Sequence, residues 1–219
     1  QHIDREGQDN AHVELVLGWL LRDESNCIDV GANEGRFLAH IVNRAKHGTH
    51  LAWEPLPEFA ERARREFPTV EVHQAALSDH AGLAEFVYVP ELPAYSSLRE
   101  RSYPSEVHPE RIQVQLERLD DSLPEGYVPH FIKIDVEGAE REVIEGGLET
   151  IARHRPIVVF EHGLGAADRY GTTPEHIWDL LAGTAKLHIF DMDAVGPLSR
   201  DHFSEIFASG ERWNYIALP

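Results

Sequence analysis

The chain has little of three features that would each point to a particular class of protein. It has one cysteine, Cys27, in 219 residues, so it cannot form an intrachain disulfide. Its 20 basic residues are outnumbered by 38 acidic ones, and the net charge of −18 argues against nucleic acids and anionic membranes as partners. The longest apolar run, Leu15 to Leu21, is too short to span a bilayer. Because the polar start of the chain also lacks a signal-peptide pattern, we expect a cytoplasmic protein.

A glycine is also missing from the loop that is the most informative part of the chain. Residues 28–35, Ile-Asp-Val-Gly-Ala-Asn-Glu-Gly, read as a buried strand, a turn and a helix start, the arrangement that forms a nucleotide-cofactor pocket in α/β proteins. A dinucleotide fold uses G-x-G-x-x-G, but this loop has only Gly31 and Gly35. Asp29 and Glu34 would repel a pyrophosphate and would suit a cationic ligand such as S-adenosylmethionine. A plain strand–turn–helix without a ligand is the structural alternative.

The rest of the chain alternates between predicted strands and helices. This alternation predicts one α/β domain over residues 1–219, with a mostly parallel sheet and helices on both faces. Strands are expected at 26–30, 49–54, 70–75, 131–135, 157–161, 187–190 and 213–218, and helices at 34–46, 58–66, 139–145 and 174–182. A first helix is expected to run from Asn10, its N-cap, to about Arg22, after a loose polar arm at 1–9.

One long segment interrupts this alternation. Residues 84–89 and 112–119 read as a hairpin-like pair of strands, and residues 90–111 lie between them. Long loops in compact domains are usually functional lids or disordered segments. Because this one contains aromatic and arginine side chains, it is predicted to be a lid.

Four predicted strands end in a carboxylate. These residues are Asp29, Glu54, Asp135 and Glu161. In a parallel sheet the carboxyl ends of the strands lie on one edge, where ligands bind, so the four acids predict a pocket. Glu54 lies near the offset at which a carboxylate accepts hydrogen bonds from both ribose hydroxyls. The alternative is that each acid caps the helix that follows it.

The segment 132–147 has the densest set of acids. Asp135 and Glu137 are expected on the turn that leaves the strand, where Gly138 lets the backbone bend close to a ligand. The acids further on are expected to be solvated helix residues; they are Glu140, Glu142 and Glu145.

Four of these segments together resemble a known family. They are Asp29-Val-Gly-Ala-Asn-Glu-Gly35, Trp53-Glu-Pro55, Ala75-Ala-Leu-Ser-Asp79 and Lys133-Ile-Asp-Val-Glu-Gly-Ala-Glu140. Over about residues 11–165 the chain is similar to the FkbM-type S-adenosylmethionine-dependent methyltransferases. The resemblance implies a Rossmann-like seven-stranded sheet with one antiparallel strand near an edge. It also implies methyl transfer from S-adenosylmethionine, usually to a hydroxyl oxygen of a small metabolite or sugar.

The resemblance also implies roles for particular residues. Asp29, Gly31 and Asn33 would line the methionine end of the cofactor, Glu54 would hold the ribose, Ser78 and Asp79 would flank the adenine, and Asp135 and Glu137 would face the reacting centre. From residue type alone, Ser78 and Asp79 would read as an ordinary turn.

Transfer to an alcohol also requires that a proton be removed. Asp135, Glu137, Glu161 or His162 could act as the base, and histidine has the best-matched ordinary pKa. A divalent metal held by Asp135, Glu161 and His162 could acidify the hydroxyl instead. No metal motif is present, so the metal-free mechanism is favoured. Two other functions remain open, an NAD-type oxidoreductase and a cofactor-binding protein without catalysis.

Overall fold

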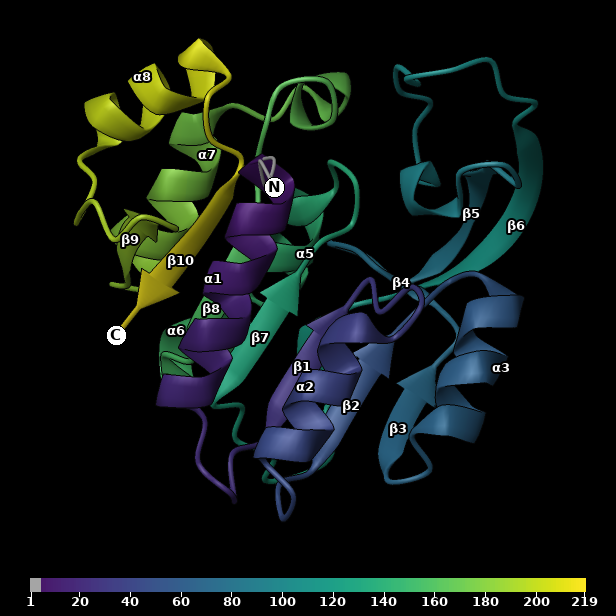
Figure 1. The fold of residues 1–219 in the computed structure, drawn as a ribbon, viewed down its shortest axis with the longest axis horizontal. Helices are drawn as coiled ribbons and strands as arrows, with labels where there is room; N and C mark the ends of the chain where they lie inside the picture. The colour runs from purple at the N-terminus through teal and green to yellow at the C-terminus, as the bar shows by residue number, and fades with distance from the viewer. Residues whose placement is uncertain (1–4) are drawn as a thin grey trace.

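A seven-stranded sheet forms the centre of the protein (Figure 1). The structure is a computed structural model that describes residues 5–219. The strands of this sheet are β1 (Cys27–Val30), β2 (His50–Trp53), β3 (Val70–His73), β7 (Phe131–Ile134), β8 (Ile157–Glu161), β9 (His188–Asp191) and β10 (Asn214–Leu218). They lie in the order β3-β2-β1-β7-β8-β10-β9, and all neighbours are parallel except that β10 is antiparallel to both β8 and β9. The expected sheet, including one antiparallel strand near an edge, is confirmed.

Helices cover both faces of this sheet. They are α1 (Arg5–Leu20), α2 (Arg36–Arg44), α3 (Pro57–Glu66), α4 (Leu119–Ser122), α5 (Glu140–Gly146), α6 (Leu148–His154), α7 (Pro174–Trp178) and α8 (Arg200–Ser209), with short turns η1 (Pro93–Tyr95), η2 (Ala167–Tyr170) and η3 (Asp179–Thr184). Leu17 of α1 and Ile41 of α2 pack with Phe131 and other strand residues in one core cluster. Ile144 of α5 and Phe203 of α8 pack in a second cluster, which includes alternate residues of the same strands. The result is a three-layer α/β/α arrangement, as the alternation of the sequence predicted.

The chain order of the strands creates a natural ligand site. From β1 the chain proceeds to β2 and β3 on one side, and it later continues from β7 to β8 on the other side. The order therefore reverses between β1 and β7. In open α/β sheets, ligands bind at the carboxyl ends of the strands on either side of such a reversal.

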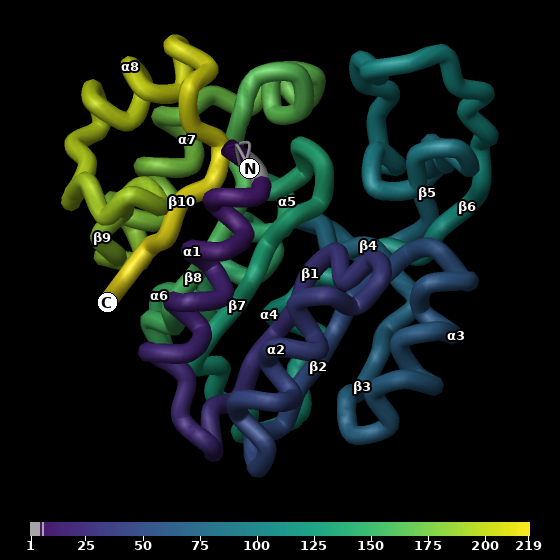
Figure 2. The backbone as a smooth tube through the Cα atoms, in the orientation of Figure 1, coloured from purple at the N-terminus to yellow at the C-terminus, as the bar shows by residue number. Residues whose placement is uncertain are grey.

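A smaller sheet stands beside the main one. Its strands are β4 (Ala76–Leu77), β5 (Gly82–Tyr88) and β6 (Glu110–Glu117), in the order β4-β6-β5. β5 and β6 pair antiparallel over their length, which confirms the expected hairpin-like pair. The segment between them, residues 89–109, forms a separate arm beyond the ends of β5 and β6 (Figure 2).

The first helix differs from the expectation. Asn10 is not an N-cap, because α1 begins at Arg5 and Asn10 lies inside it. The prediction of a loose polar arm is therefore wrong for residues 5–9. Residues 1–4 of that arm lie outside the described residues. The physical reason is a buried ion pair: Arg5 lies 2.7 Å from Asp9 one turn later, and Asp9 also accepts a hydrogen bond from Asn214. The helices of the described residues include none that is long and apolar enough to cross a lipid bilayer.

Candidate active site

The loops that follow β1 and β7 touch each other at Gly31. Gly31 has φ 78°, and a Cβ atom there would lie 1.9 Å from the carbonyl oxygen of Asp135. Its N–H donates to the carbonyl of Trp53 at 2.9 Å. Only glycine fits this contact. The close approach brings the ends of β1, β2 and β7 to one point.

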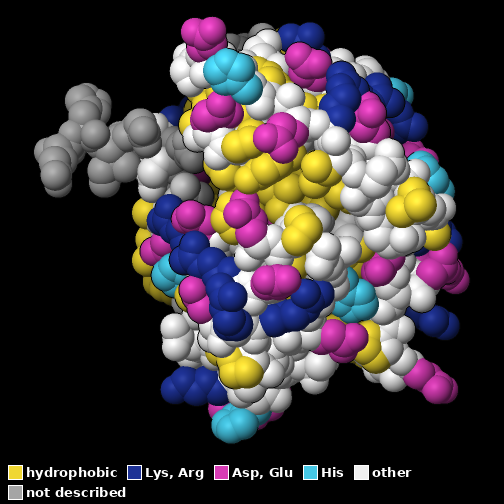
Figure 3. Space-filling view, turned by 90° about the vertical axis from the view of Figure 1, so that its right-hand side faces the viewer, with side chains coloured by type: hydrophobic (Ala, Val, Ile, Leu, Met, Phe, Trp, Pro, Cys, Tyr) yellow, Lys and Arg dark blue, Asp and Glu magenta, His cyan; other side chains and the backbone are white. Residues whose placement is uncertain are grey.

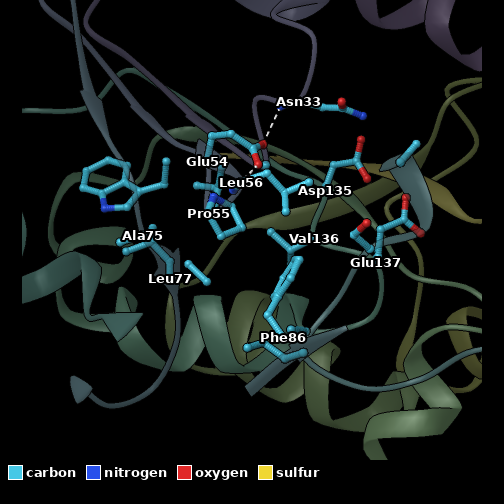
Figure 4. A pocket seen from close by; sticks show the side chains of 18 of the residues that line it. Asn33, Glu54, Pro55, Leu56, Ala75, Leu77, Phe86, Asp135, Val136 and Glu137 are labelled. Atoms are coloured by element: carbon cyan, nitrogen blue, oxygen red, sulfur yellow. Dashed lines mark hydrogen bonds between the residues drawn. The ribbon is translucent and has the colours of Figure 1, made fainter. Parts of the chain in front are cut away.

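Glu54 is fixed beside this point by backbone donors (Figure 4). Its carboxylate is 4% exposed and accepts hydrogen bonds from the N–H groups of Asn33, at 2.7 Å, and Leu56, at 2.9 Å. Burial raises the pKa of Glu54 to about 7. Each carboxylate oxygen can accept a further hydrogen bond, so the group can receive two hydroxyl donors.

Glu54 borders a mainly apolar cavity, called here the first cavity. Its walls come from β2, the Ala75–Leu77 segment, β5, the arm between β5 and β6 and the loop after β7, and include Leu77, Phe86 and Val136 (Figure 4). The side of the molecule formed by α3, β5 and β6 shows a group of hydrophobic side chains surrounded by charged ones (Figure 3). A flat apolar ring attached to a diol would match an apolar cavity with one carboxylate at its edge.

A buried lysine lies behind the Gly31 loop. The Nζ atom of Lys133 lies 3.3 Å from an oxygen of Asp29 and 3.3 Å from an oxygen of Asp135. Burial opposes the charge of Lys133, but the two carboxylates outweigh it and raise its pKa. Burial raises the pKa of Asp29, and Lys133 partly offsets this. Asp29 is fully buried, and its contact with the site is its ion pair with Lys133. Lys133 lines a second cavity, together with Gly31, Asn33 and Asp135.

Three carboxylates converge where two cavities meet. Oxygens of Asp135, Glu137 and Glu161 lie within 4.8 Å of one another. These residues line both the second cavity, of about 400 Å³, and a third cavity of about 360 Å³. Glu137 has a left-handed backbone, φ 60°, and pairs with Arg101. Burial, together with the neighbouring Asp135 and Glu140, raises the pKa of Glu161 well above its ordinary value.

His162 does not join this cluster. Its ring is 1% exposed and stacks on Phe207 with 4.7 Å between ring centroids, and both ring nitrogens lack a hydrogen-bond partner among the described residues. Burial lowers its pKa to about 4. The structure therefore places Glu137, and not His162, with Asp135 and Glu161. Successive side chains along a strand point to opposite sides, which agrees with Glu161 reaching the cluster and His162 pointing away from it.

Ser78 and Asp79 also lie apart from the cavity walls. Ser78 is buried and donates to Asp79 at 3.1 Å, and Asp79 lies 2.6 Å from His80. The residues just before them, 75–77, line the first cavity instead.

Glu140 is a site residue that sequence reasoning missed. We expected a solvated helix residue, but Glu140 is 1% exposed and accepts hydrogen bonds from the N–H groups of Val136 and Gly138, both at 3.1 Å. Burial raises its pKa to about 7. It therefore fixes the turn that carries Asp135 and Glu137. The sequence signal is an acid in the first helical turn after a glycine, where free N–H groups need an acceptor.

The arm between β5 and β6 borders all three cavities, and its Pro93 and Ala94 also line the second. Its residues Pro93, Ala94, Ser96 and Leu98 line the first cavity, and Tyr95 and Arg101 line the third. Arg169 of η2 holds the arm by a hydrogen bond, because its guanidinium donates to Ser102 of the arm at 2.8 Å. The position of the arm suits a lid, and its role as a lid stays a prediction.

Comparison with known proteins gives one family. The family model described as Methyltransferase FkbM domain matches residues 29–188. The protein named Methyltransferase 1 of Beauveria bassiana (strain ARSEF 2860) is 28% identical over 148 residues, which are 57% of this chain and 59% of that protein. 2-O-methyltransferase NoeI of Sinorhizobium fredii (strain NBRC 101917 / NGR234) is 27% identical over 156 residues, 64% of each chain.

A solved structure shows the same fold. The crystal structure of Methyltransferase FkbM from Methylobacillus flagellatus KT has a TM-score of 0.56 and 16% identity, over 90% of this chain and 44% of that one. The chain thus spans about six tenths of the length of these curated relatives and less than half of this structure.

Proposed function

The chain belongs to the FkbM methyltransferase family, and on that premise we propose that it transfers a methyl group from S-adenosylmethionine to a hydroxyl oxygen of a small metabolite or sugar. The arrangement of four carboxylates around the cavities carries the proposal. Glu54 is fixed at the edge of an apolar cavity, and three carboxylates converge where the second cavity meets the third.

The residues present fit this cofactor. Glu54 offers two acceptors for the ribose hydroxyls, and the first cavity offers apolar walls for the adenine. The buried side-chain oxygen of Asn33 has no partner among the described residues, so it can accept from the ammonium of the methionine end. Lys133 and Arg36 line the same second cavity and can face the carboxylate. When bound, S-adenosylmethionine supplies an electrophilic methyl group.

We assign proton removal to Asp135. It lines both the second and the third cavity, and its side chain is 37% exposed. Glu137 is engaged by Arg101, and burial raises the pKa of Glu161 well above its ordinary value, which favours its protonated form over the base form. The Asp135 carboxylate accepts the hydroxyl proton of an acceptor in the third cavity as the oxygen takes the methyl group.

The proposed mechanism uses no metal. Asp135, Glu137 and Glu161 have the oxygen ligands that a divalent ion prefers. However, Lys133 already pairs with Asp135, and Arg101 with Glu137, so two of the three charges have protein cations as partners. We therefore expect a chelator to leave the activity unchanged. Loss of activity with a chelator and full return with one equivalent of Mg²⁺ or Mn²⁺ would contradict the metal-free mechanism.

The test of function is transfer of a labelled methyl group from S-adenosylmethionine to a panel of hydroxylated metabolites and sugars. Label that appears as a methyl ether supports the proposal, and label on an amine would refute the assignment to oxygen. A thermal-shift comparison distinguishes a methyltransferase from an NAD-type oxidoreductase, because a ligand that binds only the folded state stabilises it. S-adenosylhomocysteine should raise the melting temperature, and NAD should not. A protein that binds S-adenosylhomocysteine but methylates no acceptor would fit the inactive alternative.

A further inference from the structure

Two arginines line the third cavity, which is the proposed acceptor site. Arg101 comes from the arm between β5 and β6, and Arg212 comes from the segment just before β10. Among residues 5–219, which the structure describes, they are the only Lys or Arg residues that line this cavity. In a chain with a net charge of −18, two arginines in the wall of one cavity require an explanation.

The guanidinium of Arg101 is held in place but has a free donor. It pairs with Glu137 through one terminal nitrogen, and it lies over the ring of Tyr95 at 4.8 Å from the ring centroid. Its side chain is 14% exposed. Its Nε atom is buried and has no hydrogen-bond partner among the described residues.

Arg212 shows the same pattern. Its terminal nitrogens donate to Asp193 at 3.1 Å and to the carbonyl of Glu211 at 3.0 Å. Its Nε atom lies 3.8 Å from Asp191, beyond hydrogen-bond distance, and is buried without a partner in the described part of the chain. A buried N–H without an acceptor costs free energy, so a ligand that brings an acceptor would be favoured.

We propose that Arg101 and Arg212 form an anion subsite that binds a carboxylate or phosphate group of the acceptor. This rests on the proposed function, since it assigns the third cavity to the acceptor. A guanidinium offers a planar row of donors that matches the oxygens of a carboxylate or a phosphate. The acceptor would then be an acidic hydroxyl compound, such as a hydroxy acid, a uronic acid or a sugar phosphate.

The charges around the third cavity allow such a ligand. Glu137 is paired with Arg101, Asp135 with Lys133, and Glu161 has a raised pKa that favours its neutral form. An anion would therefore meet guanidinium donors without an excess of unpaired carboxylates beside it.

The same chemistry could serve the carboxylate of the cofactor instead. The second cavity, which contains Asn33 and Gly31, has its own cations, Lys133 and Arg36, and neither Arg101 nor Arg212 lines it. The positions therefore assign these two arginines to the acceptor. Binding of an acceptor anion and binding of the cofactor carboxylate can be distinguished, because 5′-methylthioadenosine has no carboxylate whereas S-adenosylhomocysteine has one.

The test measures binding of matched probes to the protein saturated with S-adenosylhomocysteine. Calorimetry or ligand-observed NMR would compare glucuronate with glucose, and inorganic phosphate would serve as a minimal anion. Wild type should bind glucuronate and phosphate but not glucose. Arg101→Gln and Arg212→Gln should each weaken the anions about tenfold or more, the scale of one charge-assisted hydrogen bond. Arg101→Lys, which keeps the charge but loses the planar donors, should give an intermediate loss.

Arg111→Gln is the matched control. Arg111 is exposed on β6 and pairs with Glu85 and Glu100, so its loss should leave anion binding unchanged. The arginine variants should also bind S-adenosylhomocysteine and 5′-methylthioadenosine as wild type does. A selective loss of S-adenosylhomocysteine would assign the arginines to the cofactor and overturn the inference.

The inference is also overturned if glucose binds as well as glucuronate, or if no probe binds. It is equally overturned if the glutamine variants bind anions normally. In each of these cases the proposed function stands as long as wild type binds S-adenosylhomocysteine. If wild type does not bind that ligand, the proposed function itself fails.

Discussion

Replacing Glu54 by glutamine tests how the site recognises the ribose. The carboxylate is positioned by the N–H groups of Asn33 and Leu56, which leaves one acceptor site on each oxygen for a hydroxyl donor. Glutamine has one acceptor oxygen, and its NH₂ group would face an N–H donor. The variant therefore loses one of the two hydroxyl contacts and leaves one backbone N–H without its acceptor.

The expected loss of affinity follows from these contacts. A hydrogen bond to a charged group contributes about 1.5–3 kcal/mol, so S-adenosylhomocysteine should bind about 10-fold to 150-fold more weakly. Calorimetry would measure the dissociation constant, with Glu61→Gln as a control because Glu61 is exposed on the neighbouring α3. Circular dichroism would check that Glu54→Gln remains folded. An unchanged affinity in the folded variant would remove Glu54 from the cofactor site.

The raised pKa of Glu54 adds a pH dependence. Because burial raises this pKa to about 7, the carboxyl of the free protein is mostly protonated below pH 7 and ionised above it. Hydroxyl donors bind the ionised form better, so affinity should rise with pH up to about 7 and then level off. Below that point the loss should approach about tenfold per pH unit. In Glu54→Gln the slope should disappear, and a slope equal to that of wild type would refute this explanation.

Three further predictions test the centre of the site and the interior. Asp135→Asn should lower turnover by about 10²–10⁴-fold, and Glu137→Gln should also lower turnover. Both variants should bind S-adenosylhomocysteine as wild type does. A loss of that affinity in either variant would show that the replaced residue is structural. Lys133→Met should destabilise the fold by about 3–5 kcal/mol in urea unfolding, because it leaves Asp29 buried without its cation, and Asp29→Asn in the same chain should restore part of the loss. The pKa of His162 is lowered to about 4, so the unfolded chain binds a proton below pH 6.5 that the folded one rejects. Stability should therefore decline by about 1.4 kcal/mol per pH unit between pH 6.5 and 4, and His162→Leu should remove that part of the decline.

The fold could be predicted in outline because its signals are local. Most strands of the main sheet are short apolar runs followed by a turn or a helix start, so periodicity and chain order determine the layers. The start of α1 could not be predicted, because it depends on contacts with distant parts of the chain, the ion pair of Arg5 with Asp193 and the hydrogen bond from Asn214 to Asp9. Asn10, a typical cap residue, therefore lies inside the helix.

The candidate site was only partly predictable. Glu54 and Asp135 could be found from their strand ends, because parallel strands bring these ends together. His162 follows the strand end of Glu161 directly, yet its ring packs on Phe207 in the interior. The direction of a side chain at a strand end depends on the packing of α8, which the sequence does not reveal. Glu140 was missed for a different reason, because it was expected to be solvated and its burial depends on the turn it stabilises.

A crystal structure with S-adenosylhomocysteine would test the central claim most directly. We predict that the ribose hydroxyls lie within hydrogen-bond distance of the Glu54 carboxylate, with the adenine in the first cavity. We also predict that the sulfur lies beside Asp135, where the second and third cavities meet, and that the third cavity stays free for the acceptor. An adenosyl group bound away from Glu54, or a sulfur distant from Asp135, would contradict the account.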